Sequence, residues 1–151
     1  MGPIIDDLRI EAESPPGHQR PGASVTVTLQ FFNTGDDVRR LFFIGAENLR
    51  FGQSTFRFRP RAWPTQIQPI PREGYLPRED DFHELAPRGR LTFTQTLHLA
   101  RNIPHGDLAV EWLYENKIES WPKAMFNAGE LIPGIWRGSI SHSFKVRIAR
   151  T

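Results

Sequence analysis

The chain of 151 residues contains no cysteine, and this absence removes two structural options. Neither a disulfide framework nor a zinc site with thiolate ligands can form without that residue. A chain of this length needs neither, because it is long enough to form one domain with a hydrophobic core of its own. We therefore expect a single domain over residues 1–151 that is stabilised by packing.

Long hydrophobic runs are also missing. No stretch approaches the ~18 apolar residues that a transmembrane helix requires, so we expect no membrane span. The first residues, Met1–Asp7, lack the basic and apolar regions of a secretory signal peptide. As written, the chain would be cytoplasmic, and it would be secreted if a signal peptide has been removed. The sequence leaves its localisation open.

The known arrangements of catalytic residues are absent. No two of the five histidines are spaced i, i+2 or i, i+4, and there is no His-Glu-x-x-His. Ser54 lacks the second glycine of a nucleophile elbow, and no glycine-rich phosphate loop is present. His142 faces the apolar side of a predicted strand, where we expect a hydrogen-bonded core or rim residue and not a base. The sequence predicts a protein that is not an enzyme and has no cofactor.

A charge excess of one sign is absent too. The chain has 19 basic and 17 acidic residues, which gives a formal net charge of +2. A balanced surface of this kind is not typical of nucleic-acid-binding proteins, so we expect no nucleic-acid partner. Four polar residues near one another, Asp80, Asp81, His83 and Glu84, could approach a metal ion. In a proline-rich loop such residues are usually solvated, and we expect no metal site.

What the sequence does contain is a clear alternation of apolar and polar residues on either side of a break at Pro104–Gly106. The apolar positions are Leu91, Phe93, Leu97 and Leu99 before the break, and Leu108, Val110, Trp112 and Tyr114 after it. Successive side chains of a strand point to opposite faces, so this period of two predicts two half-buried strands. We expect these eight residues to form one sheet face at the centre of the core.

Similar patterns along the chain predict seven to eight short strands and almost no helix. The other predicted strands span residues 8–12, 24–32, 38–44, 49–58 and 139–148. Six prolines between Pro60 and Pro87 predict a long irregular crossover, with a short edge strand near Gln66–Ile70. Many short alternating strands indicate an all-β fold, and we favour an immunoglobulin-like antiparallel β-sandwich.

Three fragments carry a resemblance to known proteins. Val25–Asp36 reads as a strand that ends at Asn-Thr-Gly-Asp, Phe82–Gly89 resembles the entry to a later strand, and Ile103–Val110 resembles the turn before a penultimate strand. Together they resemble bacterial immunoglobulin-like domains, in particular the sandwich domain that precedes the catalytic part of deuterolysin-type metallopeptidases, and the bacterial intracellular proteinase inhibitors. The resemblance implies a sandwich fold and, for function, an accessory domain or an inhibitor.

One candidate binding segment interleaves arginines with aromatic residues between Arg50 and Trp63. Such a pattern could stack bases and neutralise phosphates, but it also describes an outer strand with an apolar inner face and a charged outer face. The balanced charge of the whole chain favours the outer strand. Arg57, Arg59 and Trp63 remain candidate residues for contact with a partner.

The second candidate is the segment Ile118–Trp136, which carries seven large apolar residues between two predicted strands. We expect a helix of one or two turns, capped by Ser120 and ended by Gly129. The segment could be a lid over the open end of the sandwich or a surface that binds a partner, and the sequence leaves both open. The residues assigned to partner binding here are Trp121, Met125, Phe126, Ile132 and Trp136.

These features predict a non-enzymatic interaction module. We expect a protein partner, which could be a second copy of the chain in a homo-oligomer, bound through the segment before the last strand. The alternative is a proteinase inhibitor or an enzyme-associated accessory domain, which only the resemblance suggests. A third alternative, carbohydrate binding, would use Trp121 and Trp136 as stacking platforms.

Overall fold

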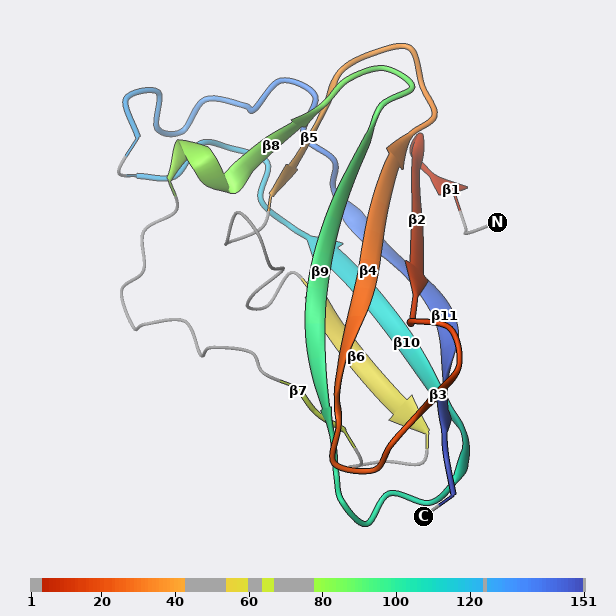
Figure 1. Ribbon diagram of the computed structural model, residues 1–151. Coiled ribbons are helices and arrows are strands. Elements are labelled where there is room, and N and C mark those ends of the chain that lie inside the picture. Colours follow the sequence, from red (N-terminus) through yellow and green to blue (C-terminus); the bar gives the residue numbers. More distant parts are fainter. Residues whose placement is uncertain (1–3, 43–53, 60–63, 67–77, 124, 151) are drawn as a thin grey trace.

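The computed structural model describes residues 4–42, 54–59, 64–66, 78–123 and 125–150, and these residues form an all-β fold (Figure 1). The strands are β1 (Ile4–Ile5), β2 (Leu8–Glu13), β3 (His18–Gln19), β4 (Ser24–Asn33), β5 (Arg39–Phe42), β6 (Ser54–Arg59), β7 (Pro64–Gln66), β8 (Phe82–Leu85), β9 (Arg90–Leu99), β10 (Gly106–Asn116) and β11 (Gly138–Ile148). Within this described part the one helical element is η2 (Glu79–Asp81), a single 3-10 turn. The all-β prediction is therefore confirmed.

The strands form two larger sheets and one small one. The five-stranded sheet has the order β1-β2-β4-β9-β7, and the four-stranded sheet has the order β3-β11-β10-β6. Strands β5 and β8 pair separately as a two-stranded sheet. Every pairing between these strands is antiparallel except that of β3 with β11, which is parallel. The expectation of purely antiparallel sheets is wrong at this point, because the chain after β2 continues in the same direction beside β11.

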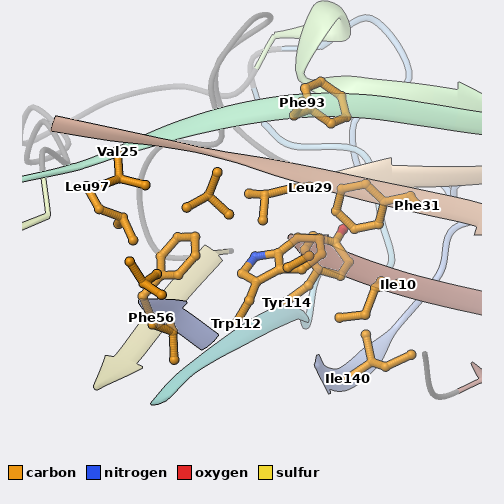
Figure 2. Packing of buried hydrophobic residues seen from close by; sticks show 14 of the residues in the cluster. Ile10, Val25, Leu29, Phe31, Phe56, Phe93, Leu97, Trp112, Tyr114 and Ile140 are labelled. Carbon is orange, nitrogen blue, oxygen red and sulfur yellow. The ribbon is translucent and has the colours of Figure 1, made fainter. Parts of the chain in front are cut away.

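The two larger sheets share one hydrophobic core, which lies between their inner faces (Figure 2). Phe31 of β4 occupies its centre. Its ring lies 4.9 Å from Tyr114 and 5.2 Å from Trp112, both on β10, and 6.0 Å from Phe93 of β9. All three contacts have edge-to-face geometry, the arrangement that aromatic quadrupoles favour. Rings from both sheets thus meet at one buried position.

The inward positions of the two central strands were predicted correctly, but their arrangement was not. Leu97, Leu99, Trp112 and Tyr114 are buried as expected. The strands that carry them, β9 and β10, belong to different sheets and face each other across the core, so the eight residues do not form one sheet face. The reason is the connection between the strands, which passes from one sheet to the other with Ile103 buried beneath it. A period of two assigns faces to a strand and says nothing about its neighbours.

The small sheet lies at the end of the molecule where β4 turns into β5 and β8 turns into β9 (Figure 1). β5 corresponds to the predicted strand at 38–44, whereas β8 falls in a stretch that was assigned to the crossover. Of the predicted edge strand at Gln66–Ile70 only Gln66 is described; it is the last residue of β7, which pairs with β9 at the edge of the five-stranded sheet. Residues 60–63 and 67–77 of the predicted crossover lie outside the described residues.

Replacing the central aromatic residues tests this core. Trp112 is fully buried and Phe93 is 7% exposed, so Trp112→Ala and Phe93→Ala should each lower the free energy of unfolding by roughly 3–5 kcal/mol. Thr92→Ala, on the exposed face of β9, is the matched control and should change it by less than ~0.5 kcal/mol. Chemical denaturation measures both effects. Losses below ~1 kcal/mol at both aromatic positions would show that the inner faces are assigned wrongly.

Candidate functional site

The connection between β10 and β11, residues 117–137, packs onto the small sheet, and we call it the β10–β11 segment. Its backbone pairs with Arg40 of β5: the Arg40 N–H donates to the Gly134 carbonyl at 2.8 Å, and the Trp136 N–H donates to the Arg40 carbonyl at 2.9 Å. The guanidinium of Arg40 adds bonds to the Pro133 carbonyl at 2.8 Å and to Glu84 of β8 at 3.1 Å. One residue of β5 therefore holds the segment against both strands of the small sheet.

Within the segment, the backbone forms a narrow stem and not the predicted helix. Ser120 bridges Leu131, the Trp121 N–H donates to the Glu130 carbonyl at 2.9 Å, and the Ile132 N–H donates to the Glu119 carbonyl at 2.9 Å. The Gly129 N–H also donates to the Trp121 carbonyl at 3.0 Å, an acceptor that the first turn of a helix capped by Ser120 would use itself. The tip consists of tight turns instead, and Gly129 closes them with a φ of 84°, which glycine adopts without strain.

Two of the predicted binding residues are anchors of this segment. Trp136 is 1% exposed; its ring N–H donates to the Ile5 carbonyl at 2.9 Å, and its ring lies 5.5 Å from that of Tyr114. Ile132 is 3% exposed and packs with Phe42 and Phe82 in a second hydrophobic cluster. Both side chains are packed inside the folded chain, and their contact with a partner stays a prediction.

The buried side chain of Asn116, at the end of β10, fixes the base of the segment. Its amide donates to the Trp136 carbonyl at 2.8 Å and to the Ile118 carbonyl at 3.1 Å, and its carbonyl accepts the Ile118 N–H at 3.0 Å. The phenol of Tyr114 nearby donates to the Phe42 carbonyl at 2.9 Å. Burial raises the pKa of Tyr114 well above its ordinary value, so the group stays a neutral donor and is unsuited to acid–base catalysis.

Trp121 and Met125 occupy an intermediate position. Both are half-buried and pack against the second cluster. The Trp121 ring lies 4.9 Å from that of Phe82 in edge-to-face contact, and the Arg40 guanidinium lies 5.9 Å from the Trp121 ring centre. Part of each side chain remains available at the surface.

Phe126 and Leu131, in contrast, project from the segment into solvent. Phe126 is 108% exposed relative to a reference residue, and Leu131 is 72% exposed. Sequence reasoning singled out Phe126 but missed Leu131. A signal was present, because neighbours in an extended stem point to opposite sides. If Ile132 packs inward, Leu131 must point outward.

The exposed large apolar residues of the described part all lie at or beside this segment. Besides Phe126 and Leu131 they are Val38 at 44% and Ile5 at 41% exposure. Both lie next to the segment. The Val38 carbonyl is so close to Gly134 that a side chain at that position would clash with it, and the Ile5 carbonyl accepts the hydrogen bond from the Trp136 ring. The apolar surface is therefore concentrated at one end of the molecule.

The arginine-rich candidate segment lies elsewhere. β6 is an edge strand of the four-stranded sheet, with Phe56 buried and Phe58 partly buried against the core. Arg57 is exposed on the outer face, 3.6 Å from Glu111 of β10. Arg59 pairs with Ala109, farther from the β10–β11 segment, and Trp63 lies outside the described residues. This arrangement is that of an outer strand with a charged face, as the sequence favoured, and any contact of these residues with a partner stays a prediction.

The acidic stretch near residue 80 has a structural role. Asp81 is buried, and its carboxylate accepts the Arg78 N–H at 2.8 Å, which caps η2. Across the described ranges, no group of three or more His, Asp or Glu side chains is placed to hold a metal ion. No helix among the same residues is long and apolar enough to cross a membrane.

Comparison with protein families and with curated proteins finds no match for this chain. Among solved structures it is similar to one described as "AvmM Catalyzes Macrocyclization in Alchivemycin A Biosynthesis". The two share 14% sequence identity with a TM-score of 0.45, over 97% of this chain and 92% of the other. At this level of similarity the match supports no statement about activity.

Removing the Asn116 side chain tests whether the β10–β11 segment is fixed to the core. Asn116→Ala leaves the Trp136 carbonyl and both backbone groups of Ile118 without this partner, so the free energy of unfolding should fall by roughly 1–3 kcal/mol. Proteolysis and hydrogen exchange within residues 117–137 should become faster. Lys117→Ala, one position away and exposed, should leave both unchanged. Equal behaviour of the two variants would show that Asn116 does not anchor the segment.

Proposed function

We propose that this chain is an immunoglobulin-like β-sandwich that acts as a non-enzymatic protein-interaction module and binds its partner through the β10–β11 segment. The observation that carries the proposal is the full exposure of Phe126 on a segment whose base is buried and hydrogen-bonded. A soluble domain gains nothing in stability from an aromatic ring in water, whereas buried aromatic anchors dominate the energetics of interfaces.

The strand order supports the immunoglobulin-like assignment. Constant-type immunoglobulin domains place strands A, B, E and D in one sheet and C, F and G in the other. In this chain β2, β4, β9 and β7 follow the first order, and β6, β10 and β11 follow the second. Strands β1 and β3 and the small sheet of β5 and β8 are additions to that plan. The sequence resemblance to the sandwich domain of deuterolysin-type metallopeptidases and to the bacterial intracellular proteinase inhibitors is compatible with this order and stays a proposal.

The same correspondence supports the choice of the β10–β11 segment as the binding surface. The β10–β11 segment is the F–G connection, and β5 lies in the B–C connection. In antibody variable domains these two connections lie together at one end and contact antigen. Here the pairing of Arg40 with Gly134 and Trp136 joins the two connections directly. A partner that reaches Phe126 would thus meet a surface built from several connections.

Preorganisation is the physical argument for affinity. The stem bonds and the Asn116 contacts hold the backbone of the segment before any partner arrives. A fixed segment loses less conformational entropy on binding than a free one, so more of the contact energy appears as affinity. Trp121 and Met125 are both half-buried, Met125 next to Phe126 in sequence, and their exposed parts would extend the contact around that anchor.

The alternatives are weaker on the same geometry. A substrate-like inhibitor could insert Phe126 into an apolar protease pocket, but the tip of the segment is a series of tight turns and not an extended strand. For carbohydrate, Trp136 is buried and the Trp121 ring is engaged by Phe82 and Arg40. A panel of purified proteases and a glycan array would identify either alternative directly.

Serine substitutions at the exposed positions test the proposal. Phe126→Ser with Leu131→Ser should change the free energy of unfolding by less than ~0.5 kcal/mol, because neither side chain is buried. The same variant should weaken self-association, or binding to a purified partner, by at least about tenfold, as loss of a central anchor does. Analytical sedimentation measures self-association, and titration calorimetry measures binding to a purified partner.

Two controls make the outcome interpretable. His105 is exposed in the connection between β9 and β10, which lies far from the segment. His105→Ala should therefore alter neither stability nor binding. Trp121→Ala removes a ring that packs on Phe82 and should lower stability as well as binding. Undiminished binding by the double serine variant would remove the β10–β11 segment from the functional account.

A further inference from the structure

One side chain joins the two larger sheets along the seam between β2 and β11. The backbone N–H of Ala12 donates to Nδ1 of His142 at 2.9 Å, although the two residues are 130 positions apart in sequence. β2 belongs to the five-stranded sheet and β11 to the four-stranded sheet. Close by, the Ser14 hydroxyl donates to the Lys145 carbonyl at 2.9 Å. His142 is thus the hydrogen-bonded rim residue that its position in the sequence predicted.

The seam needs this contact because β2 has a free side there. On one side β2 pairs with β4, where Ala12 lies opposite Leu29. On the other side β1 pairs with β2 at Leu8 and Arg9 only. At Ala12 the imidazole of His142 takes the place of a neighbouring strand. A backbone N–H in this partly buried position costs free energy if it has no acceptor.

The contact requires one protonation state of the ring. Nδ1 accepts a bond from Ala12, so it carries no proton and the neutral ring holds its proton on Nε2. The imidazolium form has an N–H on both nitrogens and cannot accept. When His142 takes up a proton, its Nδ1–H and the Ala12 N–H face each other, and no hydrogen bond can form between two donors.

We propose that His142 is a pH-sensitive latch: its neutral ring holds the end of β2 against β11, and its protonation releases that end while the aromatic core keeps the two sheets together. The aromatic contacts of Phe31 with Trp112 and Tyr114 contain no group that titrates in the same range, so they persist when the latch opens.

The charges around the ring permit this behaviour. Burial lowers the pKa of His142 below its ordinary value, and the negative charge of Glu11 on β2 opposes this with a smaller effect. The guanidinium of Arg9 lies 3.8 Å from the Glu11 carboxylate, and its positive charge offsets part of the effect of Glu11 on the ring. The residue opposite His142 on β10 is Trp112, which is uncharged. The remaining charged side chains on these three strands are Glu13 on β2, Asp107, Glu111 and Glu115 on β10, and Lys145 and Arg147 on β11.

The direction of the pH effect follows from this lowered pKa. A histidine whose pKa is lower in the folded state favours the folded state when it is neutral. The contact is complete above the ordinary histidine value of about 6.5, and it is lost as the pH falls through the lower folded-state value. The latch is therefore closed at neutral pH and opens in mild acid.

Nuclear magnetic resonance on the full ¹⁵N-labelled chain, from pH 8 to mild acid, tests the proposal. The Ala12 amide signal should titrate with the same midpoint as the His142 ring, below about 6.5. Over this range the hydrogen-exchange protection of Ala12, corrected for the intrinsic pH dependence of exchange, should fall roughly tenfold, which corresponds to the loss of one hydrogen bond. Protection of Leu29 on β4 should remain.

His142→Gln, which cannot titrate, should abolish the pH dependence at Ala12, whereas His105→Gln should leave it intact. Three results would overturn the proposal: an Ala12 signal that ignores the titration of His142, a simultaneous loss of protection at Ala12 and Leu29, or the same pH dependence in the His142→Gln variant. The first two come from the unaltered chain, so the test does not depend on whether a variant folds.

Discussion

The edge-to-face contacts of Phe31 are the interaction on which the rest of the structure depends. This ring comes from the five-stranded sheet and touches Trp112 and Tyr114 of the four-stranded sheet as well as Phe93 of its own. Without a disulfide, the two sheets are held together by packing across this core, because the chain contains no cysteine. Aromatic pairs of this geometry contribute about 0.5–1.5 kcal/mol beyond the burial of their area.

The surface at the end of the molecule depends on that core through β10. The Tyr114 ring contacts Phe31 in the core, and its hydroxyl donates a hydrogen bond to the Phe42 carbonyl of the small sheet. Two residues later, Asn116 holds both ends of the β10–β11 segment. Trp136 then stacks near Tyr114 and returns the chain to β11. The exposed position of Phe126 is therefore the far end of a continuous set of buried contacts.

The sequence was informative where one strand decides the outcome. Alternation placed Leu97, Trp112 and Tyr114 inside correctly, since a strand with one buried face needs only a period of two. It could not show that β9 and β10 lie in opposite sheets, because pairing depends on residues far away in sequence. β8 was missed because its four residues, Phe-His-Glu-Leu, form too short a run for a pattern.

The β10–β11 segment shows the same division. Its seven apolar residues indicated packing or binding, and the structure divides them by exposure: Ile132 and Trp136 are buried, while Phe126 and Leu131 are exposed. This distribution follows from backbone bonds between Arg40 and residues 134–136, which no local pattern encodes. The helix predicted from Ser120 and Gly129 was wrong for the same reason, since the stem uses those backbone groups across the segment.

Hydroxyl-radical footprinting read by mass spectrometry tests most directly the central claim that a fixed segment presents an apolar anchor. Phe126 should be labelled at a rate typical of a solvated ring, Trp136 and Trp112 should be strongly protected, and the label on Phe126 should fall when the chain associates with its partner or with itself. Labelling of Trp136 as fast as that of Phe126, or a Phe126 label that association leaves unchanged, would contradict the account.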